Sequence, residues 1–435
     1  MSQVKDIFFD EFYEELGRAV NSIKSEDMKT EPPPRMVEAL RNRWHLHEGA
    51  ESPEPFSLVA VDGGVQHTEF SHGWSASIGR ACAIVQSPNH KQPNIRKSVK
   101  IHLGRVFGRD KSYVPSYVRL TAEYDAALKG AQEVLKADGS PLVVMDGSLY
   151  LSRFPYAERE YVTHPELLTD LFQSIAQLHI LSRDRGFPLV GLSKDSSVFY
   201  LFMALLRDIL AQSDISQELK SLIRESTSPI SLKEKMTRLR QEERTFLQSL
   251  TGGDSGLSDP QLTEASTNSC GFTHPLLLAP SIYYRGGDFL PSLYRRANEL
   301  MPRDQAKSLV TALDSFFSRP TIALTYWKPR KESRSFRVDL SASSLGYRFP
   351  MKEFKLNTFI SEECDLSVLK EVLNNLGFWF CNELEYNLPL SQADRLARFD
   401  SKLYKSQYEP FIVRRLQEHG IDLKSRVRDL REMSR

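Results

Sequence analysis

The chain has 435 residues, of which 40% are hydrophobic and 26% charged, and a net charge of +1, as expected for a globular protein with a large core. No run approaches the roughly 20 apolar residues that a membrane helix needs, and the N-terminus lacks a signal-peptide pattern, so we expect a cytoplasmic protein. Its four cysteines are widely spaced without a CxxC pair, which argues against a zinc knuckle or a disulfide framework.

Residues 1–50 are predicted to form an N-terminal helical arm, interrupted by three prolines in EPPPR at 31–35. Four apolar residues of the arm recur at helical spacing: Ile7, Phe8, Phe12 and Leu16. A free arm should not expose such a face, so we expect the arm to dock on a second subunit or on a partner protein.

Short apolar runs after the arm, FSLVAVD, GRACAIVQ and KSVKIHLGRVF, predict an antiparallel meander of strands. Helical spacing of apolar residues over 116–137 predicts a helix that leads into a strand, PLVVMD. A second helix is predicted over 164–186, ending at Gly186, and the strand FPLVGLS follows it. Strand, helix and strand in close succession predict two parallel neighbouring strands.

The later part of the chain changes character twice. Residues 205–268 are charged and rich in Gln and Ser, and we interpret them as a helical insertion. RPTIALTYWKP and RSFRVDLS predict two paired strands, and the chain from Asp365 is predicted to be mostly helical. The sequence therefore predicts an α/β core, with a mixed sheet flanked by helices, in two parts, 51–204 and 269–435.

Two predicted strands end on an aspartate followed by a glycine, in VAVDGG at 59–64 and VVMDGS at 143–148. In open α/β sheets a polar residue at the carboxyl end of a strand points into the ligand-binding crevice. Two carboxylates brought together repel each other unless a cation lies between them, so Asp62 and Asp146 are candidate metal ligands. The alternative is that both are ordinary Asp-Gly turns.

Two further residues extend this site. Glu123 lies beside the apolar stripe of its predicted helix, and carboxylates from strand, helix and strand hold two divalent ions in nucleases of the ribonuclease H type. Lys194 follows the strand next to that of Asp146 and is placed to hold a scissile phosphate. Alternatively, both are solvated surface residues, and the neighbouring Glu133 competes for the role of Glu123.

Six segments in this order resemble the motifs of the NurA family: VAVDGG, AEYDAAL, VVMDGSL, GLSKDS, SFRVDL and YNLPLSQADRLARF. The resemblance runs from about Phe56 to about Phe399. It implies a ribonuclease H-like, PIWI-related core and a Mn²⁺-dependent (or Mg²⁺-dependent) nuclease acting on DNA ends. It also implies a homodimer that works with the hexameric HerA ATPase, a DNA translocase.

Carried over by position, the resemblance implies four catalytic residues: Asp62, Glu123, Asp146 and Lys194. The three carboxylates would bind the metal. Arg337 and Asp339 match a family strand that has Glu in place of this Asp. The family typically has a histidine where this chain has Asp394. We expect Asp394 to supply an oxygen ligand to the metal instead, unless it is only an acid in the first turn of a helix that begins near Ser391, with Leu396 packed inward.

A stretch at 325–337, TYWKPRKESRSFR, has five basic residues, one acid and three aromatic residues. Basic groups interleaved with aromatic rings are typical of grooves that bind single-stranded nucleic acid, although a solvated hairpin at a sheet edge fits equally well. The predicted DNA-binding residues are Trp327, Lys328, Arg330, Lys331, Arg334 and Arg337.

Two functions remain open from the sequence. The first is a metal-dependent DNA nuclease fed by a motor ATPase, since the chain contains no GxxxxGK[ST] loop of its own. The second is a catalytically weakened NurA-like subunit with a structural or regulatory role in a translocase complex.

Overall fold

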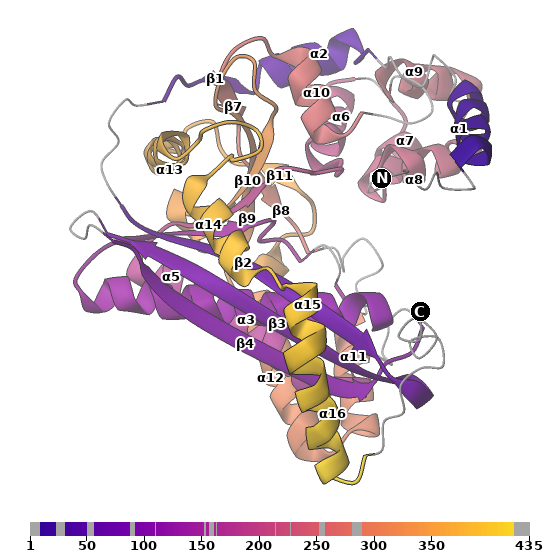
Figure 1. Ribbon diagram of the computed structural model, residues 1–435. Coiled ribbons are helices and arrows are strands. Elements are labelled where there is room, and N and C mark those ends of the chain that lie inside the picture. Colours follow the sequence, from indigo (N-terminus) through magenta and orange to yellow (C-terminus); the bar gives the residue numbers. More distant parts are fainter. Residues whose placement is uncertain are drawn as a thin grey trace. The chain divides into compact units, whose positions relative to one another are not determined.

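The computed structural model describes residues 9–22, 31–49, 56–87, 92–108, 110–151, 154–155, 161, 163–213, 215–226, 228–251, 257–280 and 289–421. The chain divides into two compact units (Figure 1). The first comprises Met1–Arg43 and Ser197–Asn268, and the second comprises Trp44–Ser196 and Ser269–Arg435. None of the helices in the described ranges combines the length and the apolar composition that a membrane crossing requires.

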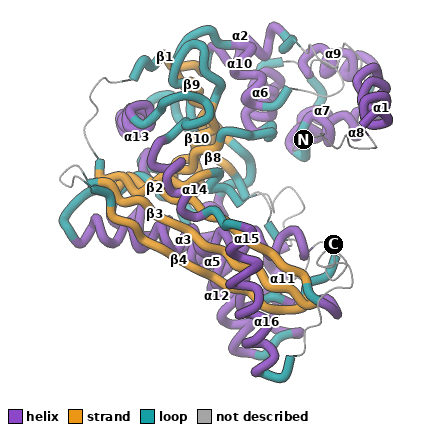
Figure 2. The backbone as a smooth tube through the Cα atoms, in the orientation of Figure 1, coloured by secondary structure: helices purple, strands orange, loops and turns teal. Residues whose placement is uncertain are grey.

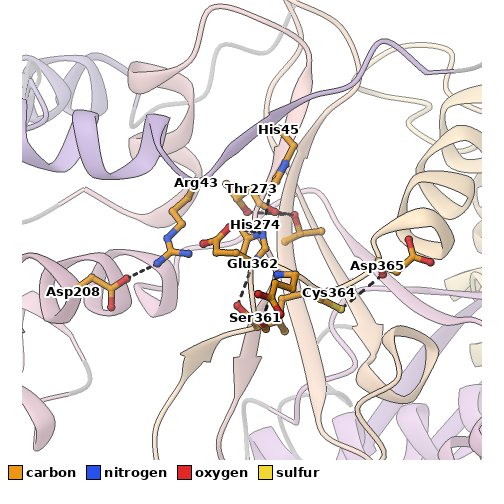
Figure 3. Close-up of polar contacts among 12 residues, drawn as sticks. Arg43, His45, Asp208, Thr273, His274, Ser361, Glu362, Cys364 and Asp365 are labelled. Carbon is orange, nitrogen blue, oxygen red and sulfur yellow. Dashed lines mark hydrogen bonds and ion pairs between the residues drawn. The ribbon is translucent and has the colours of Figure 1, made fainter.

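The first unit is helical. Its helices are α1 (Phe9–Ser22), α2 (Pro34–Arg41), α6 (Tyr200–Ala211), α7 (Gln217–Arg224), α8 (Pro229–Lys235), α9 (Gln241–Thr251) and α10 (Asp259–Ser266). Helix α2 packs against α6 and α10. The buried carboxylate of Asp259 accepts hydrogen bonds from the backbone N–H groups of Leu201 and Phe202 at the start of α6. Arg43 pairs with Asp208 at 3.1 Å (Figure 3).

The apolar face predicted for the N-terminal arm is partly visible. Phe12 and Leu16 of α1 are 59% and 46% exposed, and Phe9, Tyr13 and Val20 are also exposed. Ile7 and Phe8 lie outside the described residues. Docking of this face stays a prediction.

The second unit contains the sheet. Its strands are β1 (Trp44–Leu46), β2 (Ser57–Glu69), β3 (Trp74–Gln86), β4 (Asn94–Arg105), β5 (Pro141–Asp146), β6 (Leu189–Ser193), β7 (Gly271–Thr273), β8 (Leu276–Leu278), β9 (Ile322–Lys328), β10 (Phe336–Ser341) and β11 (Thr358–Phe359). Its helices are α3 (Asp110–Lys136), α5 (Pro165–Arg185), α11 (Phe289–Leu300), α12 (Arg303–Ser318), α13 (Ser367–Phe378), α14 (Leu388–Ala397), α15 (Ser401–Leu403) and α16 (Glu409–Glu418).

The sheet is mixed, in the order β1-β7-β9-β10-β6-β5-β2-β3-β4 (Figure 2). Outside this path, β8 pairs with β9 and β11 pairs with β8. Strands β2, β5 and β6 run parallel, and the other pairings in the described residues are antiparallel. The predicted parallel neighbours, the predicted β9–β10 pair and the mixed α/β fold flanked by helices are therefore confirmed. This arrangement is consistent with a ribonuclease H-like core.

The helix that crosses from β5 to β6 ends as predicted. Gly186 caps α5 with φ +70° and donates its N–H to Ser182, because a left-handed residue is needed to stop the helix there. Apolar residues of the strands and of α13 form the core at this end of the sheet, among them Val144, Val190, Val338, Phe272 and Leu373.

The strand predicted to end at Asp62 continues to Glu69, so this part of the prediction is wrong. Gly63 and Gly64 do not turn; they stay in antiparallel register with Ala81 and Arg80 of β3. By contrast, β5 does end at Asp146, and Gly147 follows it in the left-handed region with φ +99°.

The short strand β1 joins the sheet through β7. His45 of β1 hydrogen bonds to His274 at 3.0 Å, and His274 contacts the carbonyl of Ile360 (Figure 3). Burial lowers the pKa of His45, which favours the neutral form of its ring in this contact. The contact between His45 and His274 links the edge strand β1 to the residue that follows β7.

Candidate active site

Three carboxylates meet near the middle of the sheet. Asp62 and Asp146 each lie one position past the last paired residues of the parallel strands β2 and β5, so they are neighbours across the sheet. Glu123 comes from α3, which packs on β2, β3 and β4. Asp62 is 6% exposed and Glu123 only 2%, so the interpretation of Glu123 as a solvated helix acid is wrong.

The competing residue Glu133 points elsewhere. Its carboxylate binds Arg96 at 2.5 Å and Asn94 at 2.8 Å, both on the edge strand β4. Glu123, by contrast, interacts with Asp62 and Asp146 electrostatically.

The two glycines after Asp62 allow the helices on both faces of the sheet to pack close to β2. A Cβ atom on Gly63 would lie 2.6 Å from Oε1 of Glu123, and a Cβ atom on Gly64 would lie 2.6 Å from the carbonyl oxygen of Ala397 in α14. Successive strand residues point to opposite faces, so α3 and α14 approach the same place on β2 from opposite sides. The DGG sequence thus lets both layers come close to Asp62.

Crowding and burial perturb the carboxylates. Burial raises the pKa of Asp62 from its ordinary value of 3.8 to about 8, and the charges of Asp146 and Glu123 add to this increase. Burial also raises the pKa of Glu123 to about 7, although Arg119 opposes that shift. Arg119 lies one turn earlier on α3, with Nη1 2.6 Å from Oε1 of Glu123. Burial and the neighbouring carboxylates therefore both favour the protonated forms of Asp62 and Glu123 when no cation is bound.

A tyrosine that the sequence did not single out joins two predicted site residues. The Tyr386 hydroxyl donates a hydrogen bond to Oδ1 of Asp146. Burial, and after it the Asp146 carboxylate, raises the pKa of Tyr386 far above its ordinary value, so the phenol keeps its proton. The ammonium of Lys194 lies 5.1 Å from the centre of the same ring. Lys194 directly follows β6, two residues after Leu192, which is the register partner of Asp146.

A buried ion pair fixes the loop that follows Asp146. Arg337 binds Asp339 through two hydrogen bonds of 2.8 and 3.0 Å. Asp339 also accepts hydrogen bonds from the Ser148 hydroxyl at 2.6 Å and from the backbone N–H of Leu149 at 3.0 Å. Because Asp339 is fully buried and Arg337 is 3% exposed, this pair supports the active-site loop from inside the protein.

The predicted DNA-binding stretch is largely interior. Trp327 packs against Phe336 and Phe380, and Trp327, Lys328 and Arg337 are all less than 9% exposed. The prediction that these three residues contact DNA is wrong, because β9 and β10 lie within the sheet and bury their side chains. Three of the predicted residues lie at the surface of the connection between the strands: Arg330, Lys331 and Arg334.

Asp394 lies on α14 near the carboxylates. Its charge acts on both Asp62 and Tyr386, and its side chain is 39% exposed and pairs with Arg398 at 2.6 Å. Helix α14 begins at Leu388 rather than near Ser391, so Asp394 is in the second turn and is not a helix-start acid. Leu396 is 47% exposed and does not pack inward.

The donor set suits a hard divalent cation, which carboxylate oxygens bind and which would offset both the burial and the mutual repulsion of the carboxylates. As their side chains stand, no three His, Cys, Asp or Glu residues in the described ranges are arranged to hold an ion. Each carboxylate is turned to a neighbour: Asp62 to the N–H of Gly63, Glu123 to Arg119, and Asp146 to Tyr386. Coordination therefore requires these side chains to rotate.

One comparison with known proteins identifies a family. The model of the NurA domain, a nuclease family, matches residues 56–399, a range that includes every site residue described above. The comparisons with curated proteins and with solved structures found no match. Since the matched range covers most of its length, the chain belongs to the NurA family.

Proposed function

We propose that this NurA-family chain is a divalent-metal-dependent deoxyribonuclease that hydrolyses phosphodiester bonds. The observation that carries the proposal is the cluster of the buried Asp62 and Glu123 with the half-buried Asp146, in which the pKa of Asp62 reaches about 8 and that of Glu123 about 7. Burying like charges costs stability, so such clusters are retained where chemistry uses them.

The residues would divide the work as follows. Asp62, Glu123 and Asp146 would hold Mn²⁺ or Mg²⁺, with Asp394 as a further oxygen ligand. The ions would supply Lewis-acid polarisation of the phosphate in a two-metal arrangement. Lys194, held over the Tyr386 ring, would place a positive charge against the oxygens of the scissile phosphate.

DNA and a motor are the proposed partners. The exposed cations Arg330, Lys331 and Arg334 would contact DNA phosphates, Arg334 after giving up its ion pair with Glu383. The family assignment favours a homodimer acting with a hexameric HerA-type ATPase in DNA end processing or degradation. A motor partner is consistent with the absence of a nucleotide-binding loop from this sequence.

A catalytically weakened subunit of such a translocase complex is the second candidate. Asp394 favours it, because this chain lacks the histidine that the family typically has at this position. The intact set of Asp62, Glu123, Asp146 and Lys194 favours the nuclease.

Incubating purified protein with linear DNA and Mn²⁺, Mg²⁺ or EDTA, alone and with the candidate motor, separates the two. We expect cleavage with a divalent ion and none in EDTA. Asp62→Asn and Asp146→Asn should each abolish cleavage in folded protein, whereas Asp184→Asn, at an exposed acid of α5, should not. Cleavage by either site variant at the wild-type rate would reject the site. No cleavage by the wild type, with or without the motor, would favour the second candidate.

A further inference from the structure

We infer that Arg80 is a positioning residue that fixes helix α14, and with it Asp394, over the carboxylate cluster; this inference rests on the proposed function of that cluster. Arg80 lies on β3 and is not part of the cluster. Its Nε donates to the carbonyl of Ala397 at 2.7 Å, and its Nη2 donates to the carbonyl of Arg398. Its guanidinium carbon lies 4.2 Å from the centre of the Phe399 ring.

These contacts hold the C-terminal end of α14. The last carbonyls of a helix have no partners within it and carry the negative end of the helix dipole, so a guanidinium is a favourable partner for them. A planar fork with donors on two nitrogens can bind two successive carbonyls and stack on a ring at the same time. A lysine ammonium can make one of these contacts but cannot reproduce the set.

The strand next to Arg80 is shaped for the same contact. Gly64 of β2 is the register partner of Arg80, and a Cβ atom at this position would lie 2.6 Å from the carbonyl oxygen of Ala397. The end of α14 therefore rests directly on the backbone of β2 while Arg80 holds it from β3. Two independent features of adjacent strands converge on one carbonyl.

The position of α14 matters to the site because of what it carries. Asp394 lies one turn before the held carbonyls, and its own backbone carbonyl accepts the N–H of Arg398 at 2.8 Å. Its side chain pairs with Arg398, the residue that follows α14. The distance of Asp394 from Asp62 is thus set by the helix, and the helix end is set by Arg80 and Gly64.

The test uses two variants that loosen the contact in different ways, Arg80→Lys and Gly64→Ala, each made alone and together with Asp394→Ala. Arg96→Lys is the matched control, an arginine on the adjacent strand that pairs with Glu133 and not with α14. Mn²⁺ affinity is measured calorimetrically on the full chain without DNA, and amide hydrogen exchange is measured over α14. We expect Arg80→Lys and Gly64→Ala to weaken Mn²⁺ binding roughly tenfold, as outer partners of metal ligands do, and to speed exchange in α14.

In the Asp394→Ala background, the same two substitutions should weaken Mn²⁺ binding by less than about twofold further, because they act through that carboxylate. Unchanged Mn²⁺ affinity in Arg80→Lys overturns the inference, as does a full additional loss in the Asp394→Ala background. A wild type that binds Mn²⁺ with the expected variant pattern but cleaves no DNA rejects the nuclease proposal and supports the role of Arg80. A wild type that binds no Mn²⁺ rejects both.

Discussion

Replacing Asp62 with asparagine should stabilise the metal-free protein at pH 8. The folded-state pKa of Asp62 is about 8 against an ordinary value of 3.8, so between these values the folded chain keeps a proton that the unfolded chain has released. Stability is therefore lost as the pH rises through this window. A shift of this size corresponds to an upper bound of about 6 kcal/mol. Because the proton is shared with the neighbouring carboxylates, we expect the wild type to lose about 2–4 kcal/mol of unfolding free energy over this pH range. The Asp62→Asn variant, which has no proton to release there, should not show this loss.

Calorimetric unfolding in EDTA at several pH values measures this effect. The Tm of Asp62→Asn should exceed that of the wild type by several degrees at pH 8 and approach it near pH 4. Added Mn²⁺ should raise the wild-type Tm and not that of the variant. Asp125→Asn is the opposite control, because net hydrogen bonding to Lys129 and Ser98 outweighs burial and lowers the pKa of Asp125. That variant should lose stability at pH 8. Parallel pH profiles for Asp62→Asn and the wild type would refute the electrostatic account of the cluster.

The remaining predictions concern groups around the cluster. Tyr386→Phe should reduce cleavage roughly 10- to 100-fold at saturating Mn²⁺ without changing the circular dichroism spectrum, because Asp146 loses the hydroxyl that orients it. Steady-state kinetics measure this effect, and cleavage at the wild-type rate would contradict it. Asp339→Asn should destabilise the chain by about 3–5 kcal/mol, since it removes the buried negative charge that accepts two hydrogen bonds from Arg337; a denaturant melt with an unchanged midpoint would refute that. Asp394→Ala should raise the Mn²⁺ concentration needed for half-maximal cleavage, and Asp394→His should retain or increase activity with Mn²⁺; identical metal titrations would exclude this residue from the site. Gly63→Ala should lower Mn²⁺ affinity by displacing Glu123, and normal binding would show that the helix can shift to accommodate the methyl group.

Much of the core could be predicted because its signals are local. Apolar periodicity identified α3 and α5, and strand, helix and strand in succession fixed the parallel pairing of β5 with β6. That pairing places Lys194 two residues after the register partner of Asp146. Glu123 was found from its place beside an apolar stripe, although the sequence alone did not show that it is buried.

The contacts that the sequence did not reveal join distant segments. Tyr386 is 240 residues from Asp146, and Asp339 is 190 residues from Leu149. No spacing rule connects such pairs, because they meet only through the order of strands in the sheet. The basic and aromatic residues of β9 and β10 suggested a DNA-binding surface for the same reason. Their pattern does not show that α13 packs on this part of the sheet and buries Trp327 and Phe336.

The DGG sequence shows why local rules were only half right about Asp62. An Asp-Gly pair at the end of an apolar run predicts a turn, and at Asp146 the left-handed φ of Gly147 agrees with that rule. At Asp62 neither following glycine has a left-handed φ, and both remain in the strand. A side chain at Gly63 would clash with Glu123 on one face of the sheet, and a side chain at Gly64 would clash with Ala397 on the other. Gly147 is needed for its left-handed backbone conformation, whereas Gly63 and Gly64 are needed because a side chain would clash with the adjacent helices. Only the packing of those helices distinguishes the two roles. Since the close-approach glycines admit an acid from α3 and the end of α14 to the same aspartate, they tie the local sequence to the electrostatics of the site.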